Sequence, residues 1–317
     1  MCAPLRVLYM GTPEFAVAPL LTLIQNNYTI IAVVTAPDKP AGRGKKIQES
    51  AVKKIAVSHN LPVLQPTNLR DETFVQTVRD LAPDLIFVVA FRMLPKCIWE
   101  IPPLGTCNLH ASLLPQYRGA APINWALVHG ETETGVTTFF INEEIDTGHI
   151  IAQKKVAIEY TDTAGDLHDK LMHVGASLVL ETVKNIQCGN STPVPQVVPP
   201  SMVLRAAPKI SKEICKINWN ATAETIYNHI RGFSPYPAAW FEFSNNKETY
   251  ICKILSAEFQ VHHEKTIPAK IHQTKTTLSI SCADGFIFPK DIQIQGKKCM
   301  NVEECLRGFS FEACTII

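Results

Sequence analysis

The sequence predicts an α/β domain built on a Rossmann-like parallel sheet, followed by a small OB-like β-barrel domain. In the first part of the chain, β-branched runs of strand length alternate with segments of helical spacing, which is typical of a parallel sheet covered on both faces. Beyond residue 206, short strand-like runs follow one another closely, which favours a small barrel. A length of 317 residues agrees with two domains.

The expected elements of the first domain alternate regularly along the chain. Strands are expected at residues 5–10, 30–35, 62–64, 85–90, 135–142 and 152–159. Helices are expected at residues 15–24, 50–59, 72–81 and 163–186. Gly11-Thr12-Pro13 ends the first strand without the glycine pattern of a dinucleotide site, and no phosphate-binding P-loop sequence is present.

A proline-rich stretch separates the two predicted domains. Residues 190–200 (NSTPVPQVVPP) contain four prolines and cannot continue a helix. We therefore interpret residues 1–189 as the first domain, 190–205 as a fairly stiff linker and 206–317 as the second domain. The strands expected in the second domain lie at residues 250–255, 257–261, 269–271, 278–282 and 285–289.

Composition excludes several classes of protein. With 46% hydrophobic and 19% charged residues the chain resembles a soluble globular protein, and no run of 18 apolar residues predicts a membrane span. A net charge of +1 predicts no general attraction to nucleic acid, so any such partner depends on local charge. The ten cysteines lack C-x-x-C spacing, which favours reduced thiols and predicts no zinc site.

Three polar residues are candidates for acyl-transfer chemistry. If residues 106–110 form a strand, Asn108 and His110 point to the same face, because side chains alternate along a strand. An amide can donate to a developing oxyanion and an imidazole can move a proton. Asp146 follows another expected strand and could orient the imidazole. Cys107 is interpreted as a buried strand residue rather than a nucleophile.

A longer motif around these residues resembles a known family. The run NLHASLLP at residues 108–115, followed by Arg118-Gly119 and Ala121-Pro122, is similar to the signature of the formyltransferases that use 10-formyltetrahydrofolate. IDTG at residues 145–148 resembles the aspartate loop of that family. The resemblance implies that Asn108, His110 and Asp146 are catalytic, that 10-formyltetrahydrofolate is the co-substrate and that no metal takes part.

The resemblance also implies where the folate binds. The residues expected to bind it are Ser112, Leu113, Leu114, Pro115, Phe91, Arg92 and Leu94. Many relatives have an aromatic residue followed by glycine where this chain has Phe91-Arg92, so the pterin pocket is expected to differ there.

Further segments resemble the members of the family that act on initiator methionyl-tRNA. They are residues 5–16 (LRVLYMGTPEFA), 37–46 (PDKPAGRGKK), 207–210 (APKI) and 230–240 (IRGFSPYPAAW). Arg43, Lys45 and Lys46 are therefore expected to contact tRNA phosphates, whereas Lys53 and Lys54 are interpreted as solvated helix residues. The resemblance implies methionyl-tRNA and folate as partners, with the second domain binding tRNA. A monomer without membrane attachment in the bacterial cytoplasm is also expected.

Two alternatives remain open at this point. One is a formyltransferase whose acceptor is a small amine, such as glycinamide ribonucleotide or an amino sugar-nucleotide. Such an enzyme is expected to lack the basic loop at residues 37–46 together with the barrel at 206–317. The other is a non-catalytic RNA-binding protein on the same fold, against which the presence of Asn108, His110 and Asp146 argues.

Overall fold

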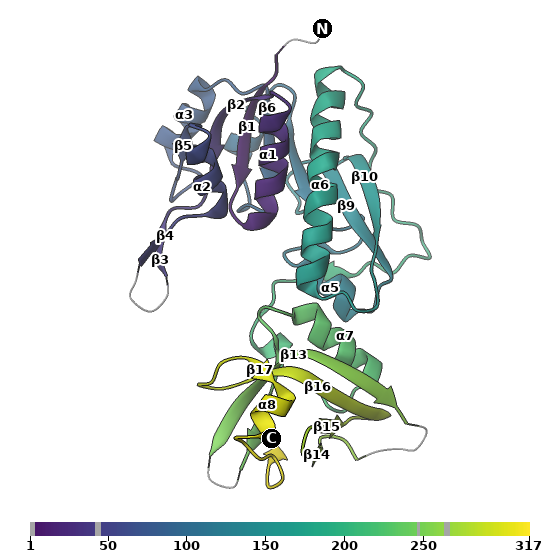
Figure 1. Ribbon diagram of the computed structural model, residues 1–317. Coiled ribbons are helices and arrows are strands. Elements are labelled where there is room, and N and C mark those ends of the chain that lie inside the picture. The colour runs from purple at the N-terminus through teal and green to yellow at the C-terminus, as the bar shows by residue number, and fades with distance from the viewer. Residues whose placement is uncertain (1–3, 42–45, 246–247, 263–266) are drawn as a thin grey trace. The chain divides into compact units, whose positions relative to one another are not determined.

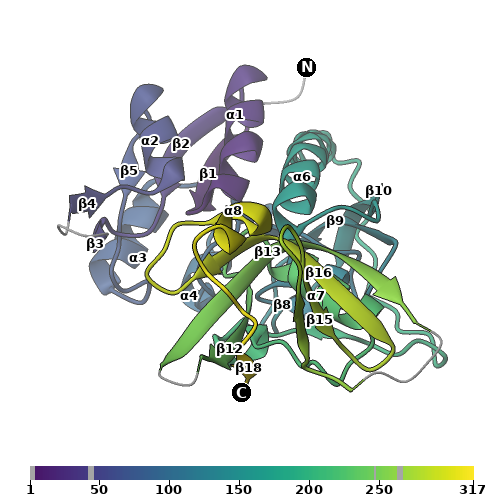
Figure 2. The same cartoon turned by 60° about the horizontal axis from the view of Figure 1, so that its bottom comes forward.

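The computed structural model describes residues 4–41, 46–245, 248–262 and 267–317, and they form two compact units. The first unit contains residues 1–119, 133–157 and 168–206, and the second contains 120–132, 158–167 and 207–317. The units are thus interleaved along the chain rather than separated by one cut in the proline-rich stretch. Figure 1 and Figure 2 show the elements of both units.

A seven-stranded sheet forms the centre of the first unit, in the order β10-β9-β7-β6-β1-β2-β5. Its strands are β1 (Arg6–Gly11), β2 (Thr29–Val34), β5 (Val63–Leu64), β6 (Leu85–Val89), β7 (Thr106–His110), β9 (Glu133–Phe140) and β10 (Ile150–Ala157). The strands from β5 to β7 in this order are parallel, whereas β9 runs antiparallel to β7 and β10 antiparallel to β9. The Rossmann-like α/β prediction is confirmed, with an antiparallel edge added.

Helices cover both faces of this sheet. They are α1 (Val17–Gln25), α2 (Ala51–Ser58), α3 (Glu72–Asp80), α4 (Lys96–Trp99) and α6 (Ala164–Gln187), and the 3-10 helix η1 (Glu14–Ala16) precedes α1. On one face, Ile86 and Val88 of β6 pack with Val78 of α3 and Ile98 of α4. On the other face α6 approaches β7 closely, because a Cβ on Gly175 would lie 2.8 Å from the Leu109 side chain.

The basic segment at residues 37–46 is a hairpin rather than only a loop. β3 (Lys39–Ala41) pairs antiparallel with β4 (Lys46–Gln48), with Lys39 opposite Gln48 and Ala41 opposite Lys46. Figures 1 and 2 both show this hairpin projecting from the first unit beside α2. The residues between its strands, 42–45, lie outside the described part of the chain.

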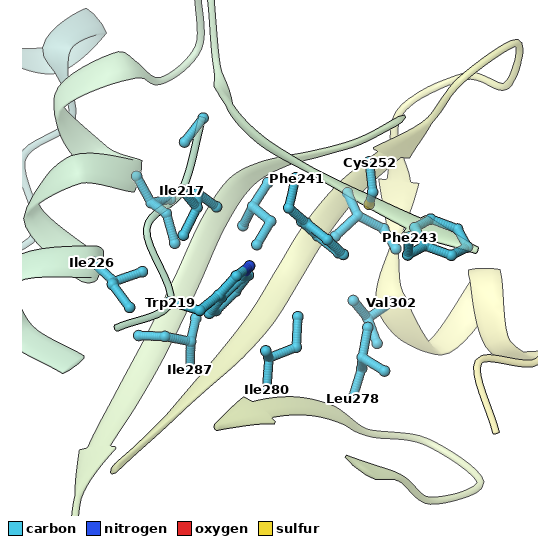
Figure 3. Close-up of a cluster of buried hydrophobic side chains, with 14 of the residues drawn as sticks. Ile217, Trp219, Ile226, Phe241, Phe243, Cys252, Leu278, Ile280, Ile287 and Val302 are labelled. Atoms are coloured by element: carbon cyan, nitrogen blue, oxygen red, sulfur yellow. The ribbon is translucent and has the colours of Figure 1, made fainter. Parts of the chain in front are cut away.

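An antiparallel sheet curls around the core of the second unit. Its strands are β12 (Ala239–Ser244), β13 (Thr249–Val261), β14 (Ile271–Gln273), β15 (Leu278–Ser281), β16 (Gly285–Ile294), β17 (Met300–Asn301) and β18 (Thr315–Ile316), in the order β14-β15-β16-β13-β12-β18 with β17 against β16. The enclosed side chains include Trp219, Phe241 and Ile287 (Figure 3). Trp219 and Phe241 meet edge to face at 5.5 Å, so the small-barrel prediction is confirmed.

The remaining elements are short strands and helices. They are β8 (Arg118–Gly119), β11 (Ala206–Ala207), α5 (Pro122–Val128), η2 (Glu213–Cys215), α7 (Ala223–Phe233) and α8 (Val302–Leu306). Thr222 caps α7 by accepting from the backbone N–H of Thr225.

The prediction of separate strands at 250–255 and 257–261 is wrong, because both belong to β13. Its register against β16 shifts between Ile254 and Ala257, and such irregularities interrupt the alternation of side chains on which the prediction rests. The strand expected at 285–289 is also longer and continues to Ile294.

Candidate active site

Asn108 and His110 lie on β7, between β6 and the antiparallel β9. Asn108 is opposite Val88 on one side and Phe139 on the other, and His110 is opposite Thr137. Because the two residues are separated by one position on a strand, their side chains project from the same face of the sheet. Asn108 is half-buried and His110 is only 7% exposed. The pair therefore sits at the carboxyl end of a central strand, where open α/β sheets bind ligands.

The two ring nitrogens of His110 face different partners. Nε2 lies 2.8 Å from the backbone oxygen of Tyr117. A carbonyl oxygen can only accept, so Nε2 carries the hydrogen and the neutral ring has its lone pair at Nδ1. Nδ1 lies 3.7 Å from Oδ2 of Asp146, which is an ion-pair distance once the ring is protonated. The pair is therefore set to receive a proton at Nδ1.

Asp146 is held in place by its own turn. Its backbone is in the left-handed region at φ +54°, and its Oδ2 accepts from the backbone N–H of Gly119 at 2.9 Å. Two residues later, a Cβ on Gly148 would lie 1.6 Å from the Phe140 backbone oxygen, so only glycine fits there. The carboxylate is thus directed toward the ring of His110 by backbone geometry.

Gln196 joins the two loops of the site, and the sequence analysis did not single it out. Its amide nitrogen donates to the backbone oxygens of Asp146 at 2.8 Å and Gly148 at 2.9 Å. Its amide oxygen accepts from the Arg118 guanidinium at 2.6 and 3.1 Å. Gln196 lies in the stretch interpreted as a linker, where a glutamine among prolines gives no local signal of such a role.

The loop after His110 is closed by internal hydrogen bonds. Ser112 is completely buried, and its hydroxyl donates to the Gln116 backbone oxygen at 2.6 Å. Thr137 Oγ donates to the Ser112 backbone oxygen at 2.7 Å, and Gln153 donates to the Leu114 backbone oxygen at 2.9 Å. The Ser112 hydroxyl therefore shapes the loop, and folate binding by this loop stays a prediction.

The loop end nearest β9 has a similarly tight fit. Leu114 is 3% exposed, whereas Leu113 and Pro115 are half-buried. A Cβ on Gly135 would lie 2.6 Å from the Leu113 side chain. Leu113 therefore packs closely against the backbone of β9 at Gly135.

After β6, Arg92 braces two neighbouring loops. Its guanidinium donates to the backbone oxygens of Pro66 at 2.7 Å and Thr67 at 3.0 Å, beyond the end of β5. It also lies over the ring of Phe91, 5.3 Å from the ring centroid. Leu94 is 8% exposed and packs into the core against the α3 and α4 side of the sheet. Arg92 thus bonds to a neighbouring loop and Leu94 is buried in the core, and folate binding by these residues stays a prediction.

The residues expected to contact tRNA are described only in part. Arg43 and Lys45 lie outside the described residues, and for Lys46 the backbone belongs to β4. Lys53 is not a freely solvated residue, because its ammonium pairs with Asp38 and Glu49 and its side chain is 17% exposed. Lys54, the next residue on α2, is exposed.

The second unit contains a pocket of about 780 Å³ with basic walls. Lys209, Lys212 and Lys253 line it, and the described lining residues include no Asp or Glu. The ammonium of Lys212 lies 5.1 Å from the ring centroid of Trp240, and Tyr236 at the wall is 82% exposed. Ammonium groups beside aromatic rings suit a ligand that carries phosphates and flat bases.

The remaining candidate groups show no catalytic geometry. Burial raises the pKa of the Cys107 thiol far above its ordinary value, so it stays protonated on a strand interior. Among the described residues, no three His, Cys, Asp or Glu side chains are grouped as metal ligands. In the same part of the chain, no helix is long and apolar enough to cross a membrane.

The chain belongs to the formyl transferase family. Residues 5–183 match the family described as formyl transferase, and residues 209–310 match its C-terminal domain. The chain is 51% identical to a Bacteroides fragilis protein named methionyl-tRNA formyltransferase, over 96% of this chain and 95% of that protein. It is 50% identical to a Flavobacterium johnsoniae protein of the same name, over 97% of each.

Solved structures with the same fold include a formyl transferase named for a sugar acceptor. The chain is similar to a sugar 3N-formyl transferase named WlaRD, with a TM-score of 0.66, 22% identity and coverage of 93% of this chain and 99% of that one. It is also similar to HypX from Aquifex aeolicus, solved with tetrahydrofolic acid, with a TM-score of 0.64, 18% identity and coverage of 96% and 47%.

The match to the sugar enzyme bears on what the second unit says about the acceptor. Coverage of 93% of this chain includes most of the second unit, so an enzyme named for a sugar acceptor carries a similar unit. The barrel by itself therefore does not separate tRNA from small-amine acceptors, and the expectation that such enzymes lack the barrel together with the basic loop stays a prediction.

Proposed function

We propose that this chain transfers the formyl group of 10-formyltetrahydrofolate to the α-amino group of initiator methionyl-tRNA. The observation that carries the proposal is the identity of about half of all residues with proteins named methionyl-tRNA formyltransferase, over nearly the full length of both chains. The arrangement of Asn108, His110 and Asp146 supplies the groups that such a transfer requires. Neighbours solved with folates support a folate as the formyl donor.

In the proposed reaction, the neutral amine attacks the formyl carbon. A carbon–nitrogen bond forms and the carbonyl electron pair moves to oxygen. The amide of Asn108 donates to that oxygen, which lowers the barrier because the charge appears only in the transition state. Collapse of the tetrahedral species breaks the bond to the folate nitrogen and restores the carbonyl.

His110 and Asp146 move the proton in this scheme. The unprotonated Nδ1 takes a proton from the attacking amine as the new bond forms, because Nε2 is already donating to Tyr117. The resulting imidazolium is stabilised by the Asp146 carboxylate, which lies 3.7 Å away. The proton then passes to the leaving folate nitrogen, so the ring returns to its starting state.

Docking of the tRNA is assigned to two basic surfaces. Arg43, Lys45 and Lys46 of the hairpin are proposed to contact phosphates of the acceptor arm. The pocket with Lys209, Lys212 and Lys253 is proposed to take a further part of the tRNA backbone, since its wall is basic and aromatic. The second unit is therefore the proposed tRNA-binding unit.

The proposal includes the setting in which the enzyme acts. The chain is proposed to act as a monomer, as expected from the sequence. Its named relatives come from bacteria, which supports the bacterial cytoplasm as the place of action.

The test combines binding and product formation. Initiator methionyl-tRNA is incubated with the protein and 10-formyltetrahydrofolate, complexes are resolved by gel shift, and formylated tRNA is resolved on acid-urea gels. The proposal expects both a complex and a formylated product. A complex without product would instead support the non-catalytic RNA-binding interpretation.

A further inference from the structure

The two strands of the basic hairpin join the rest of the first unit at two neighbouring points. The outgoing strand β3 starts directly after Asp38, and the returning strand β4 ends directly before Glu49. Helix α2 begins two residues after Glu49 and carries Lys53 near its start. We call Asp38 the outgoing root of the hairpin and Glu49 its returning root.

The ammonium of Lys53 contacts both roots. It donates to Oδ2 of Asp38, and it lies 3.0 Å from Oε1 of Glu49. The hydrogen bond with Asp38 is the main cause that raises the pKa of Lys53, and the same bond lowers the pKa of Asp38. Both groups therefore stay charged around neutral pH.

Neighbouring hydrogen bonds tie the same roots to the sheet. Gln65, just after β5, donates to Oδ1 of Asp38 at 2.8 Å and to the Ala36 backbone oxygen at 2.9 Å. The hydroxyls of Thr35 and Ser50 lie 2.7 Å apart, and Ser50 also accepts from the Lys53 backbone N–H. The hairpin roots thus share one network, with Lys53 at its centre.

We infer that Lys53 is a positioning residue that fixes the basic hairpin by bridging its two roots, rather than a residue that contacts tRNA. This inference rests on the proposed role of the hairpin in tRNA docking. The charge of Lys53 is already matched by two carboxylates, so it adds little attraction for phosphate. A fixed hairpin binds tRNA more tightly because less conformational freedom is lost on binding.

Two neighbouring lysines allow a matched test. Lys53→Met and Lys54→Met each remove one positive charge from the same helix, but only the first opens the bridge. We expect Lys53→Met to raise the KM for methionyl-tRNA roughly five- to tenfold with kcat nearly unchanged. Lys54→Met is expected to change that KM less than about twofold.

Asp38→Asn separates loss of the bridge from a change in general electrostatic attraction, because the two effects shift the KM for tRNA in opposite directions. The substitution removes a negative charge beside the basic hairpin, so general electrostatic attraction would lower the KM for tRNA. Loss of the bridge would instead raise the KM for tRNA, and a raised KM is the result that we expect. Lys53→Arg keeps a cation at the bridge and is expected to recover much of the parental KM.

A structural readout accompanies the kinetics. Amide hydrogen exchange at residues 39, 41 and 46–48 should be faster in Lys53→Met than in Lys54→Met, while exchange in β6 and β7 stays the same. Unchanged exchange in β6 and β7 also shows that the variant is folded.

Equal tRNA KM values for Lys53→Met and Lys54→Met, or a lowered KM for Asp38→Asn, would overturn the inference. Failure of the parental protein to formylate methionyl-tRNA would instead overturn the proposed function, so the two failures are distinguishable.

Discussion

The candidate active site and the root of the basic hairpin lie in the same unit but are built differently. At the active site, His110 and Asp146 are held by backbone groups and by the neutral amide of Gln196, in surroundings almost closed to solvent. At the hairpin roots, Lys53 is held by Asp38 and Glu49, whose side chains are 24% and 44% exposed. In the proposed function, the chemistry thus depends on a buried network of mostly neutral hydrogen bonds, and acceptor docking depends on a partly exposed network of charges.

This contrast teaches how one fold can serve several acceptors. Folates are named with two of the similar solved structures, so a donor site of fixed geometry fits the proposed function. The acceptor differs between relatives named for tRNA and for sugars. Substitutions at the two places should therefore change different kinetic constants.

Asn108→Ala should have the largest effect. Loss of one oxyanion donor typically costs about 2.7–4 kcal/mol of barrier, so turnover should fall roughly a hundredfold or more. Steady-state formylation of methionyl-tRNA measures it, with Cys107→Ala as the control, because Cys107 lies on the same strand but projects to the other face. Near-parental turnover in folded Asn108→Ala would remove Asn108 from the mechanism.

Gln196→Ala should have the second-largest effect, because it removes a hydrogen-bond partner of Arg118 and of two backbone oxygens in the aspartate turn. Leaving such groups unpaired costs about 1–3 kcal/mol, so Gln196→Ala should lower kcat/KM roughly tenfold or more. Gln196→Glu keeps the acceptor for Arg118 but cannot donate to the backbone. If Gln196→Glu restores activity, pairing with Arg118 matters and bracing of the aspartate turn does not.

Arg43→Ala should change acceptor binding and leave the donor untouched. Because a single phosphate contact is lost, we expect the KM for tRNA to rise roughly five- to tenfold and the salt dependence to weaken by about one counterion. Folate affinity, measured by fluorescence titration, should stay the same. A matching loss of folate affinity would contradict a role confined to tRNA.

The pH dependence of the hairpin bridge should be the smallest effect. The lowered pKa of Asp38 means that its contribution is lost only as pH falls through that value, below the ordinary 3.8. The raised pKa of Lys53 means that its contribution is lost only as pH rises through a value above 10.5. The ratio of tRNA KM between Lys53→Met and the parental protein should therefore be flat from about pH 5 to 9. A ratio that changes strongly inside this window would contradict the bridge.

The parts of the molecule that the sequence predicts are those with a local signal. Buried parallel strands such as β6 are continuous apolar runs, and helix α2 starts at a serine cap, so both are visible in the sequence. The shared face of Asn108 and His110 follows from their spacing alone.

The parts that the sequence does not predict depend on contacts between distant segments. Gln196 reaches Asp146 across 50 residues and Arg118 across 78, and nothing near Gln196 signals either bond. Lys53 is an ordinary helix lysine until the hairpin brings Asp38 beside it. The register shift within β13 likewise depends on its pairing with the distant strand β16.

The most direct test of the proposed function compares acceptors in one assay. Formylation by 10-formyltetrahydrofolate is measured with initiator methionyl-tRNA, glycinamide ribonucleotide and a dTDP-linked amino sugar, each alone and in competition. The proposal predicts a kcat/KM for methionyl-tRNA that exceeds both others by orders of magnitude. Equal or greater kcat/KM for either small amine would contradict it.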